Sequence, residues 1–360
     1  MHSFAWGQRL LLFLLGMTCV RAETVWRAAT TLGVEGRGWT NTASPFHRLP
    51  THAKAQVPSS VWELSQSSAG LAIRFLTRAD TVEVRWSLKS GSLAMPHMPA
   101  TGVSGMDLYA REGAPGAWRF VANGRPSGQE SNRAAFRLGP AGTERECLLY
   151  LPLYNGLSQL ELGTEPGFEL RPATGRPATR RDPVVVYGTS IVQGGCASRP
   201  GLAYPAVLGR RLDRPVINLG FSGSGRMEPG VVEILAEQAP AAFVIDCLWN
   251  LSDELPAEIE RRVTQLITTV RRKHPNTPIV FVGQSEFRRE QHPTVATQAQ
   301  ERAVRAQSMA GVAELHLVAG IDLLGTDGEG TVDGVHPNDL GMLRHADALG
   351  PVMMKLLGQR

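Results

Sequence analysis

Four short stretches in the second half of the chain carry side chains that can do chemistry together. They offer a serine nucleophile, two hydrogen-bond donors and an aspartate–histidine pair: Gly188–Ser190, Asn218–Gly223, Asp246–Asn250 and Asp333–His336. A serine hydroxyl needs a neighbouring base to become a nucleophile, and that base needs a group that orients it. Each stretch alone is weak evidence, but four in this order, three of them directly after strand-like runs, are hard to obtain by chance. The set indicates hydrolysis of an ester.

Ser190 follows the strand-like run Val184–Tyr187, with only Gly188 and Thr189 between them. We therefore expect it on the turn at the carboxyl end of a strand. There its hydroxyl is exposed and backbone N–H groups lie near developing negative charge. The alternative interpretation is a serine that merely caps the N-terminus of a helix.

Asp333 and His336 stand three residues apart, just before a proline that opens a helix-like segment. At this spacing the Asp333 carboxylate can accept from one imidazole nitrogen while the other nitrogen faces Ser190. The alternative is a surface turn in which Asp333 caps the last helix and His336 is solvated. The order Ser, Asp, His also fits the α/β-hydrolase arrangement, but that needs a G-x-S-x-G elbow, which residues 220–224 miss by one position.

Three N–H groups are predicted to form an oxyanion hole, which stabilises the negative charge of a tetrahedral intermediate. They are the backbone N–H groups of Ser190 and Gly223 and the side-chain amide of Asn250. Gly223 follows the run Val216–Leu219 and has no Cβ to block approach, and Asn250 follows the run Phe243–Asp246. The alternatives are an ordinary loop glycine and an ordinary turn asparagine.

The elements that must position these groups differ between the two halves of the chain. Residues from about 24 to 175 show almost no helical periodicity. Apolar and polar residues alternate there in short runs separated by Gly, Pro and Asn clusters, which predicts many short strands and a β-sandwich. The runs are Leu71–Leu76, Thr81–Trp86, Gly105–Ala110, Trp118–Ala122, Cys147–Leu151 and Leu157–Leu162.

After Pro183, strand-like and helix-like segments alternate. This pattern predicts a parallel sheet with helices on both faces, and such sheets bind ligands beyond the carboxyl ends of their strands. Buried strands are expected at Val184–Tyr187, Val216–Leu219, Ala242–Ile245 and Pro278–Val282. Helices are expected at Ala203–Leu212, Pro229–Gln238, Glu258–Lys273, Thr294–Met309 and Asn338–Leu357.

The length of 360 residues exceeds one typical domain, and 42% hydrophobic residues can bury substantial cores. We place a β-sandwich domain at residues 23–178, with a linker near 171–181, and an α/β domain at 179–360. The net charge is +4, and the basic residues come mostly singly or in pairs. A nucleic-acid-binding surface needs a denser basic stripe, so we expect no nucleic-acid partner.

Residues 1–22 have the pattern of a secretory signal peptide. Arg9 precedes the apolar run Leu10–Val20, which is too short to span a bilayer, and small residues end at a cleavage position after Ala22. A lipoprotein acylated at Cys19 and an uncleaved anchor are the alternatives. We expect a secreted or periplasmic protein with no membrane span in the mature chain.

Three cysteines follow the predicted leader: Cys147, Cys196 and Cys247. This number gives no disulfide framework and one bridge at most. Cys196 and Cys247 lie close in sequence to the chemical stretches, so their thiols are expected to pack near the site. No Cys/His spacing resembles a zinc site, and we expect neither a metal nor an organic cofactor.

From Pro183 onward the chain resembles the SGNH, or GDSL-type, hydrolase superfamily. Ser190, Gly223, Asn250 and His336 match the four residues that name it, and Asp333 matches its triad acid. The resemblance implies a three-layer, flavodoxin-like α/β domain. The chain departs from the family pattern at three positions that carry no catalytic atom: Thr189 and Leu251, where many members have Asp, and Leu248, where glycine is usual.

The upstream half resembles the N-terminal β-rich domain of one subfamily, which bears a Gly-x-Asp-Leu-Tyr signature, here Gly105–Tyr109. The stretches Gly188–Ile191 and Gly194–Pro200 also resemble that subfamily. The resemblance implies a jelly-roll-like sandwich and an exported esterase that removes acyl groups, acetyl in particular, from a carbohydrate. A lipase, lysophospholipase or thioesterase would use the same triad. A glycan-binding protein with an inactive hydrolase half is the alternative from another class.

The loops after the predicted catalytic strands are too short to build a deep cleft unaided. The first half has irregular stretches that suit sugars, namely Ser92–Ser104 with His97, and a hairpin tip with Tyr154. Because ligand pockets favour domain interfaces, we expect one or both stretches to form a wall over Ser190. Otherwise His97 is a surface or core residue, and Tyr154 only packs the hairpin.

Overall fold

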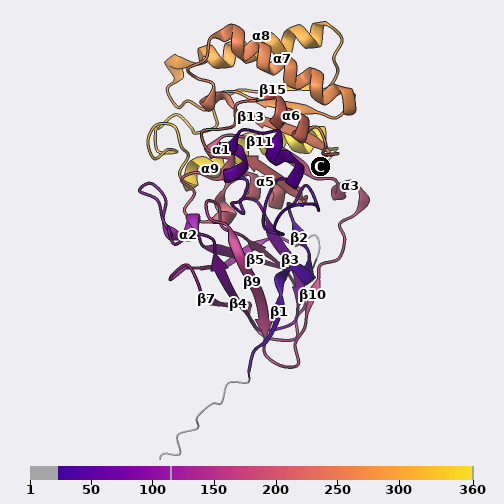
Figure 1. Ribbon diagram of the computed structural model, residues 1–360, viewed down its shortest axis with the longest axis vertical. Coiled ribbons are helices and arrows are strands. Elements are labelled where there is room, and N and C mark those ends of the chain that lie inside the picture. The colour runs from indigo at the N-terminus through magenta and orange to yellow at the C-terminus, as the bar shows by residue number, and fades with distance from the viewer. Residues whose placement is uncertain (1–22, 114–115, 359–360) are drawn as a thin grey trace, which may run out of the picture.

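The computed structural model describes residues 23–113 and 116–358. It shows two parts stacked along the long axis of the molecule, a β-sandwich below and a helix-covered parallel sheet above (Figure 1). The predicted leader, residues 1–22, lies outside the described residues. Cleavage after Ala22 and acylation of Cys19 therefore stay predictions.

Two antiparallel sheets form the sandwich. The first has the order β1-β9-β4-β7 and comprises β1 (Val25–Ala28), β9 (Leu157–Thr164), β4 (Thr81–Leu88) and β7 (Asn132–Arg137). The second has the order β10-β3-β8-β5-β6, with β2 also paired to β3. It comprises β10 (Leu170–Pro172), β3 (Ala72–Thr77), β8 (Arg145–Tyr150), β5 (Met106–Glu112), β6 (Arg119–Gly124) and β2 (Val34–Glu35).

The sandwich core lies between these sheets. Val82, Val84 and Trp86, alternate residues of β4, are at most 2% exposed and share one cluster with Ile73 and Phe75 of β3. Side chains of a strand point to opposite faces in turn, so a sequence period of two produces one buried face. The predicted β-sandwich is confirmed.

The upper part is built on five parallel strands in the order β12-β11-β13-β14-β15. Along the sheet these are β12 (Val216–Gly220), β11 (Val184–Gly188), β13 (Ala242–Asp246), β14 (Ile279–Val282) and β15 (Leu315–Val318). Of these five strands, the first along the chain, β11, lies between the second, β12, and the third, β13, which is the flavodoxin-like order. The predicted fold class is confirmed. The direction in which successive strands are added to the sheet reverses at β11.

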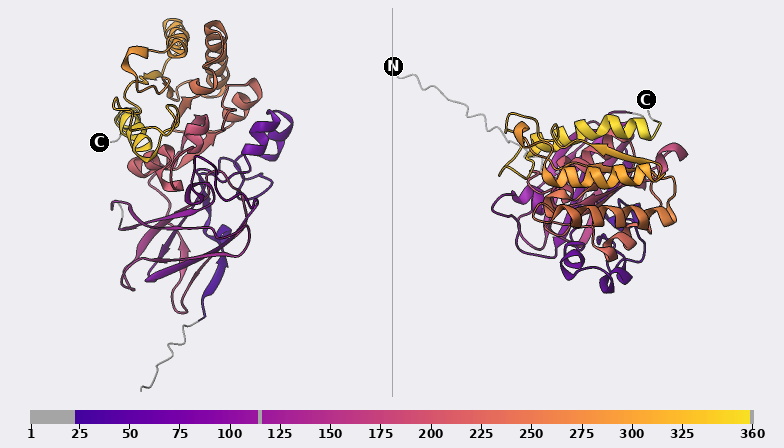
Figure 2. Two further views of the ribbon diagram at one scale, coloured as in Figure 1. Left: turned by 90° about the vertical axis from the view of Figure 1, so that its left-hand side faces the viewer. Right: turned by 90° about the horizontal axis from the view of Figure 1, so that it is seen from above.

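Helices cover both faces of this sheet (Figures 1 and 2). Val185 and Tyr187 of β11 pack with helices α6 (Pro229–Leu235), α7 (Pro256–Lys273) and α8 (Val295–Met309). Val184 and Val186 pack on the other face with α5 (Tyr204–Leu212) and α9 (Asp339–Leu356). Because both faces are covered, the strand is apolar at every position, as the sequence of a buried parallel strand predicts.

The observed counterparts of the predicted elements lie within a few residues of the expected positions, but the sequence pattern missed the strands β1, β2, β7, β10 and β15. All of these except β2 are edge strands of their sheets. β7 has one large buried apolar residue, Phe136, and β15 is mostly half-buried. An edge strand is covered on fewer sides, so its sequence carries a weaker hydrophobic period than a central strand does.

The stretch from 39 to 64 departs from the all-β expectation for the first half. It forms a 3₁₀ helix at Thr51–Ala55 and α1 (Ser59–Leu64), and α1 lies beside the α/β part in Figures 1 and 2. Five of its residues belong to the buried cluster on one face of the parallel sheet: Trp39, Leu49, Ala53, Val57 and Val61. By packing, this stretch is part of the α/β half, so contacts cross a domain boundary drawn at residue 178.

A second contact between the parts uses the Gly105–Tyr109 signature. Asp107 is fully buried, and its Oδ2 accepts from Arg199 Nη1 at 2.7 Å and from Gly201 N at 2.8 Å. Tyr109 Oη lies 2.7 Å from the same Arg199 nitrogen. Burial raises the pKa of Asp107, although Arg199 acts in the opposite direction. The signature thus holds the segment that follows Ser190 by about ten residues.

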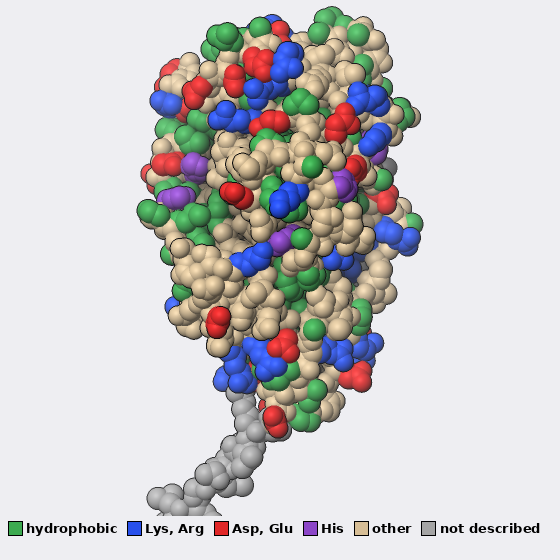
Figure 3. Space-filling model, in the orientation of Figure 1, with side chains coloured by type: hydrophobic (Ala, Val, Ile, Leu, Met, Phe, Trp, Pro, Cys, Tyr) green, Lys and Arg blue, Asp and Glu red, His purple; other side chains and the backbone are tan. Residues whose placement is uncertain are grey.

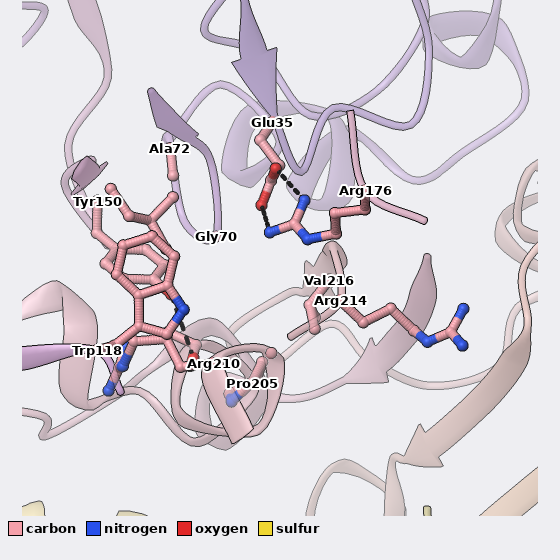
Figure 4. A pocket seen from close by; sticks show the side chains of 13 residues that line it. Glu35, Gly70, Ala72, Trp118, Tyr150, Arg176, Pro205, Arg210, Arg214 and Val216 are labelled. Carbon is pink, nitrogen blue, oxygen red and sulfur yellow. Dashed lines mark hydrogen bonds and ion pairs between the residues drawn. The ribbon is translucent and has the colours of Figure 1, made fainter. Parts of the chain in front are cut away.

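A pocket in the interface is separate from the four chemical stretches, none of which lines it. Figure 4 shows Glu35 and Arg176 paired on one side, with Tyr150 and Trp118 on the other and Pro205 of α5 nearby. Arg176 Nη2 donates to Glu35 Oε1 at 2.9 Å. Glu35 is the last residue of β2, and Arg176 follows β10, the last strand of the sandwich in the chain. This ion pair connects the start and the end of the sandwich segment of the chain, next to α5.

Charged side chains of both signs are interspersed on the face shown in Figure 3, without a continuous basic stripe there. Among the residues that the structure describes, no helix is long and apolar enough to cross a membrane. Cys147, Cys196 and Cys247 are all buried and unpaired.

Candidate active site

Ser190 lies at the exit of the central strand β11. The chain turns at Thr189 into the short helix α4 (Ser190–Gln193). Thr189 caps this helix, because its Oγ1 accepts from Ile191 N at 3.2 Å. Ser190 is therefore the first helical residue and not the cap, so the interpretation as a capping serine is wrong. An N–H group at this position has no acceptor within its own helix.

A serine hydroxyl, an imidazole and a carboxylate form one chain of hydrogen bonds. Ser190 Oγ lies 2.9 Å from His336 Nε2, and His336 Nδ1 lies 2.7 Å from Asp333 Oδ2. Asp333 Oδ1 also accepts from the backbone N–H groups of Val335 and His336, at 3.0 and 2.8 Å. Partial burial raises the pKa of Asp333, but these hydrogen bonds outweigh it and hold the pKa below its usual value. The carboxylate is therefore charged at neutral pH and can orient the imidazole.

Asp333 does not cap the last helix. The N-cap of α9 is Asn338, whose Oδ1 accepts from Gly341 N at 3.1 Å. Asp333 instead closes its own turn, in which Gly334 has a φ of +90°, a value that favours glycine. The alternative of a capping aspartate with a solvated histidine is therefore wrong.

The loop 221–225, which follows β12, leaves one backbone N–H group free. Gly223 N has no acceptor in residues 23–113 and 116–358, and a Cβ on Gly223 would meet nothing within 4 Å. The other four N–H groups of the loop donate to the protein. These bonds run from Phe221 N to Gly188 O at 2.9 Å, Ser222 N to Gln193 Oε1 at 3.0 Å, Ser224 N to Phe221 O at 2.9 Å and Gly225 N to Asn250 Oδ1 at 3.1 Å.

Asn250 stands at the end of a 3₁₀ turn, Leu248–Asn250, that follows β13. Its side-chain oxygen accepts from Gly225 N at 3.1 Å. Because a backbone N–H can only donate, this bond fixes the orientation of the amide and leaves its NH₂ group as a donor. The bond also couples Asn250 to the loop that carries Gly223.

The turns after β11, β12 and β13 meet at the point where the strand order reverses, which is where such sheets bind ligands. Glycines allow their backbones to touch. A Cβ on Gly220 would lie 2.0 Å from Gln193 N, and one on Gly225 would lie 2.1 Å from Gly188 O. No side chain fits at either place, so the Gly223 loop is pressed against the turn of Ser190.

The comparisons with known proteins agree with this geometry. Residues 181–354 match the GDSL-like lipase/acylhydrolase family, and residues 24–170 match GxDLY, the N-terminal domain of SGNH-hydrolase-type esterases. The crystal structure of a putative GDSL-like lipase from Bacteroides ovatus is 35% identical, covers 94% of this chain and 99% of its own, and has a TM-score of 0.82. The chain belongs to the GDSL-like lipase/acylhydrolase family. None of the curated proteins matches it.

Two further solved structures share the fold of this GDSL-like protein. The salicylyl-acyltransferase SsfX3 from a tetracycline biosynthetic pathway is 17% identical, covers 92% of this chain and 97% of its own, and has a TM-score of 0.72. A family two carbohydrate esterase from Clostridium thermocellum, in complex with cellohexaose, is 15% identical, covers 81% of this chain and 93% of its own, and has a TM-score of 0.55. At these identities the likeness shows the fold alone.

As a member of this family the protein is an ester hydrolase, and the arrangement is suited to acyl transfer. The hydroxyl, the imidazole and the carboxylate are connected, and two donors at Gly223 and Asn250 lie on turns adjoining that of Ser190. Within the described part of the chain, no group of three or more His, Cys, Asp and Glu side chains is placed to hold a metal ion.

Tyr154 and His97, from the first half of this GDSL-like protein, both lie at the site. The prediction of a hairpin tip at Tyr154 is wrong, because β8 and β9, which flank it, belong to different sheets. Tyr154 Oη donates to Ser190 O at 3.3 Å, and burial raises the pKa of the phenol. His97 is exposed on a turn closed by hydrogen bonds between Met95 and Met98, and its ring centre lies 6.2 Å from that of His336. Contact of either residue with a substrate stays a proposal.

No sequence pattern pointed to Gln193, which connects three parts of the site. It is fully buried, its Oε1 accepts from Ser222 N at 3.0 Å, and its Nε2 donates to Leu153 O at 3.2 Å. It lies one helical turn after Ser190, where a single glutamine belongs to no recognisable period. Cys196 lies near the site, as expected. Burial, with the charge of Asp333, raises the pKa of its thiol to about 11, so the thiol stays protonated at neutral pH.

Proposed function

We propose that this protein is an exported serine esterase that removes acyl groups, acetyl groups first of all, from a carbohydrate. Ser190 is the nucleophile, His336 the general base and Asp333 the group that orients the imidazole. The observation that carries the proposal is the unbroken relay from Ser190 Oγ to His336 at 2.9 Å and on to Asp333 at 2.7 Å. The reaction uses no metal and no organic cofactor.

The reaction proceeds in two similar steps. Ser190 Oγ bonds to the acyl carbon while its proton passes to His336 Nε2, and the carbonyl electron pair moves onto the oxygen. The tetrahedral intermediate collapses and expels the sugar oxygen, which takes the proton from His336. Water then attacks the acyl-enzyme in the same way, and the acid leaves as the Ser190 hydroxyl is restored.

The oxyanion formed in each step is bound by the N–H groups of Ser190 and Gly223 and by the Asn250 amide. Two observations support this assignment. Gly223 N is the one N–H of its loop without an acceptor in the described residues, and Asn250 is turned by Gly225 N so that its NH₂ group can donate. Donors fixed before the reaction stabilise the transition state without paying for reorganisation.

A carbohydrate substrate is supported by the exposure of residues around Ser190, which is itself 8% exposed. Asp333 and Gly223 are exposed, and the side chain of His336 is 27% exposed, which suits a bulky chain carrying a small acyl group. His97 and Tyr154 are proposed to form the wall that faces the sugar. The Clostridium thermocellum structure of the same fold, a carbohydrate esterase in complex with cellohexaose, also supports a sugar.

A lipase, lysophospholipase or thioesterase is the second candidate, favoured by the name of the Bacteroides ovatus relative, a putative GDSL-like lipase. The two candidates differ in the acyl chain that they accept. On a series of aryl esters, a deacetylase loses rate steeply beyond acetate, whereas a lipase gains rate with chain length. Measurable turnover of any ester excludes a glycan-binding protein with an inactive hydrolase half.

The direct test is an assay of acetate released from a panel of acetylated polysaccharides, with Ser190→Ala as the blank. Release by the wild-type protein from one or more polymers, absent from the blank, is the expected result. Equal release by both proteins, or turnover of long-chain esters only, would contradict the proposal.

Export is the part of the proposal that depends on residues 1–22 alone. Its support is the apolar run Leu10–Val20 followed by the predicted cleavage position after Ala22. N-terminal sequencing of the protein recovered outside the cytoplasm should begin at Glu23. A lipid-modified Cys19 at the new N-terminus would instead show the lipoprotein alternative.

A further inference from the structure

Arg48 is a buried arginine that the proposed mechanism does not use. It lies in the first half of the chain, yet its guanidinium reaches the end of β12 in the α/β half. It is 2% exposed, and no carboxylate of the described residues forms an ion pair with it. Its hydrogen bonds all go to backbone carbonyls: Nε to Ser67 at 3.0 Å, Nη1 to Asn218 at 3.2 Å and to Gly220 at 2.7 Å, and Nη2 to Leu64 at 2.7 Å.

The position of these carbonyls connects Arg48 to the loop 221–225, which carries Gly223 and is called the oxyanion loop below. β12 is the edge strand of the parallel sheet and pairs only with β11 among the described strands. Arg48 Nη1 donates to two backbone carbonyls of that strand, on Asn218 and Gly220. Gly220 is the last residue before the loop 221–225. The guanidinium also lies over the ring of Phe221, the first residue of the loop, 4.9 Å from its centroid. Arg48 therefore contacts the backbone just before the loop and the first side chain of the loop that carries Gly223.

The charge of Arg48 makes this arrangement unusual. Burying a cation without a carboxylate partner costs stability, so such groups are rare where packing alone is needed. Burial lowers the pKa of Arg48 to about 9, which leaves the guanidinium charged at neutral pH. A fixed positive charge behind an oxyanion loop favours the anionic intermediate over the neutral ester.

We propose that Arg48 is a positioning residue for the reaction, which fixes the loop 221–225 so that the Gly223 N–H meets the oxyanion. The proposal rests on the proposed function of Ser190 and adds to it a part supplied by the first half of the chain. The stretch 39–64 is then more than a cover for the sheet edge, because its arginine sets the geometry of the oxyanion hole.

Arg214 offers a matched control within the same protein. It is 4% exposed, and its guanidinium also donates to backbone carbonyls, from Nη1 to Asp182 O at 2.7 Å and from Nη2 to Thr179 O. Burial lowers its pKa as well. It precedes β12, whereas the oxyanion loop follows that strand. Loss of either arginine therefore removes a buried guanidinium. Of the two, only Arg48 contacts the residues at the start of the oxyanion loop, Gly220 and Phe221.

The experiment compares Arg48→Met and Arg48→Lys with Arg214→Met and Arg214→Lys. The melting temperature reports folding, and kcat and KM are measured on a small aryl acetate. We expect Arg48→Met to lose about 10²-fold in kcat with KM unchanged, as expected when a transition-state interaction is lost. Arg48→Lys keeps the charge but fewer donors, so its kcat should lie between wild type and Arg48→Met. Both Arg214 variants should keep wild-type kcat while melting at a similarly lowered temperature.

Two results would overturn the proposal: wild-type kcat in folded Arg48→Met, or an equal fall in Arg214→Met. If Arg48→Met does not fold, Arg48→Lys decides, since an unchanged kcat contradicts the proposal and a fall without a change in KM supports it. Ser190→Ala is measured beside them. Wild-type and Ser190→Ala proteins of equal rate would refute the proposed function itself, whereas an active wild type with an inactive Ser190→Ala isolates the question of Arg48.

Discussion

The two halves of the molecule reach one site in different ways. The α/β half carries each proposed reacting or oxyanion-binding group on a turn or loop after a parallel strand, as with Ser190, Gly223 and Asn250. The first half of the chain sends side chains to those turns, as with Tyr154 on Ser190 O and Arg48 at the end of β12. The difference separates chemistry, which the α/β half places at the ends of its own strands, from positioning, to which the first half of the chain contributes across the contact between the halves.

The largest effect is expected in the α/β half. Ser190→Ala should fold normally and lose roughly 10⁴-fold or more in kcat/KM, because the nucleophile is gone. His336→Ala should fall about as far and the double variant little further, since members of a triad act as a unit. Kinetics on an aryl acetate, with circular dichroism for folding, check this. More than a tenth of wild-type rate in Ser190→Ala would show that another residue is the nucleophile.

The next largest effect is expected at the side-chain amide of Asn250, on the turn after β13. Asn250→Ala should lose about 10²- to 10³-fold in kcat, the usual effect of losing one oxyanion donor. Asn250→Asp is the sharper variant, because its carboxylate still accepts from Gly225 N while the donor is replaced by a negative oxygen. It should be at least as slow as Asn250→Ala. A wild-type rate in Asn250→Asp would mean that this amide does not donate to the oxyanion.

Each half also buries one histidine, His47 in the first half and His345 in the second. Burial is the main reason why the pKa of each imidazole is lowered to about 4. The unfolded state, with a pKa of about 6.5, takes up the proton first as the pH falls. The stability that comes from keeping His345 neutral is therefore present above about pH 6.5 and is lost as the pH falls toward 4.

Urea unfolding of the wild type and His345→Gln measures this loss. Between about pH 7.5 and about pH 4.5, the free energy of unfolding of the wild type should fall by about 2 to 3 kcal/mol more than that of the variant. Parallel curves for the two proteins would contradict the lowered pKa. A single transition is expected, because residues 39–64 pack on the parallel sheet and join the halves.

The smallest effect is expected in the sandwich half and depends on the substrate. His97→Ala and Tyr154→Ala should slow turnover of an acetylated glycan more than that of a small aryl acetate, by roughly fivefold each, the worth of about one hydrogen bond. Tyr154→Phe keeps the ring and removes the bond to Ser190 O, so it separates packing from hydrogen bonding. Equal losses on both substrates, or none, would make the sandwich a spacer or a stability module.

The same comparison explains what the sequence could predict. The parallel sheet and the four chemical stretches were predictable, because buried parallel strands are apolar throughout and three of the stretches follow such strands directly. The flavodoxin-like arrangement was implied by the family resemblance. Ser190, Asp333 and His336 could be connected before the structure because an Asp three residues before a His is a local pattern.

The support of the site could not be predicted in this way. Arg48 and Gln193 act through hydrogen bonds to segments far away in sequence, and one arginine or glutamine belongs to no period. The packing of residues 39–64 on the parallel sheet was missed for a related reason, since its apolar residues fit no regular helix or strand pattern. The edge strands β7 and β15 were missed because partial burial leaves a weak alternation.

The central claim is that Ser190 is the nucleophile activated by His336. The most direct measurement is labelling with an organophosphonate that reacts with activated serines, followed by mass mapping of the modified peptide and an assay of the remaining activity. The expected result is one label per chain on Ser190, loss of hydrolysis in proportion to labelling, and no label in Ser190→Ala or His336→Ala. A label on another residue, or full activity in the labelled protein, would contradict it.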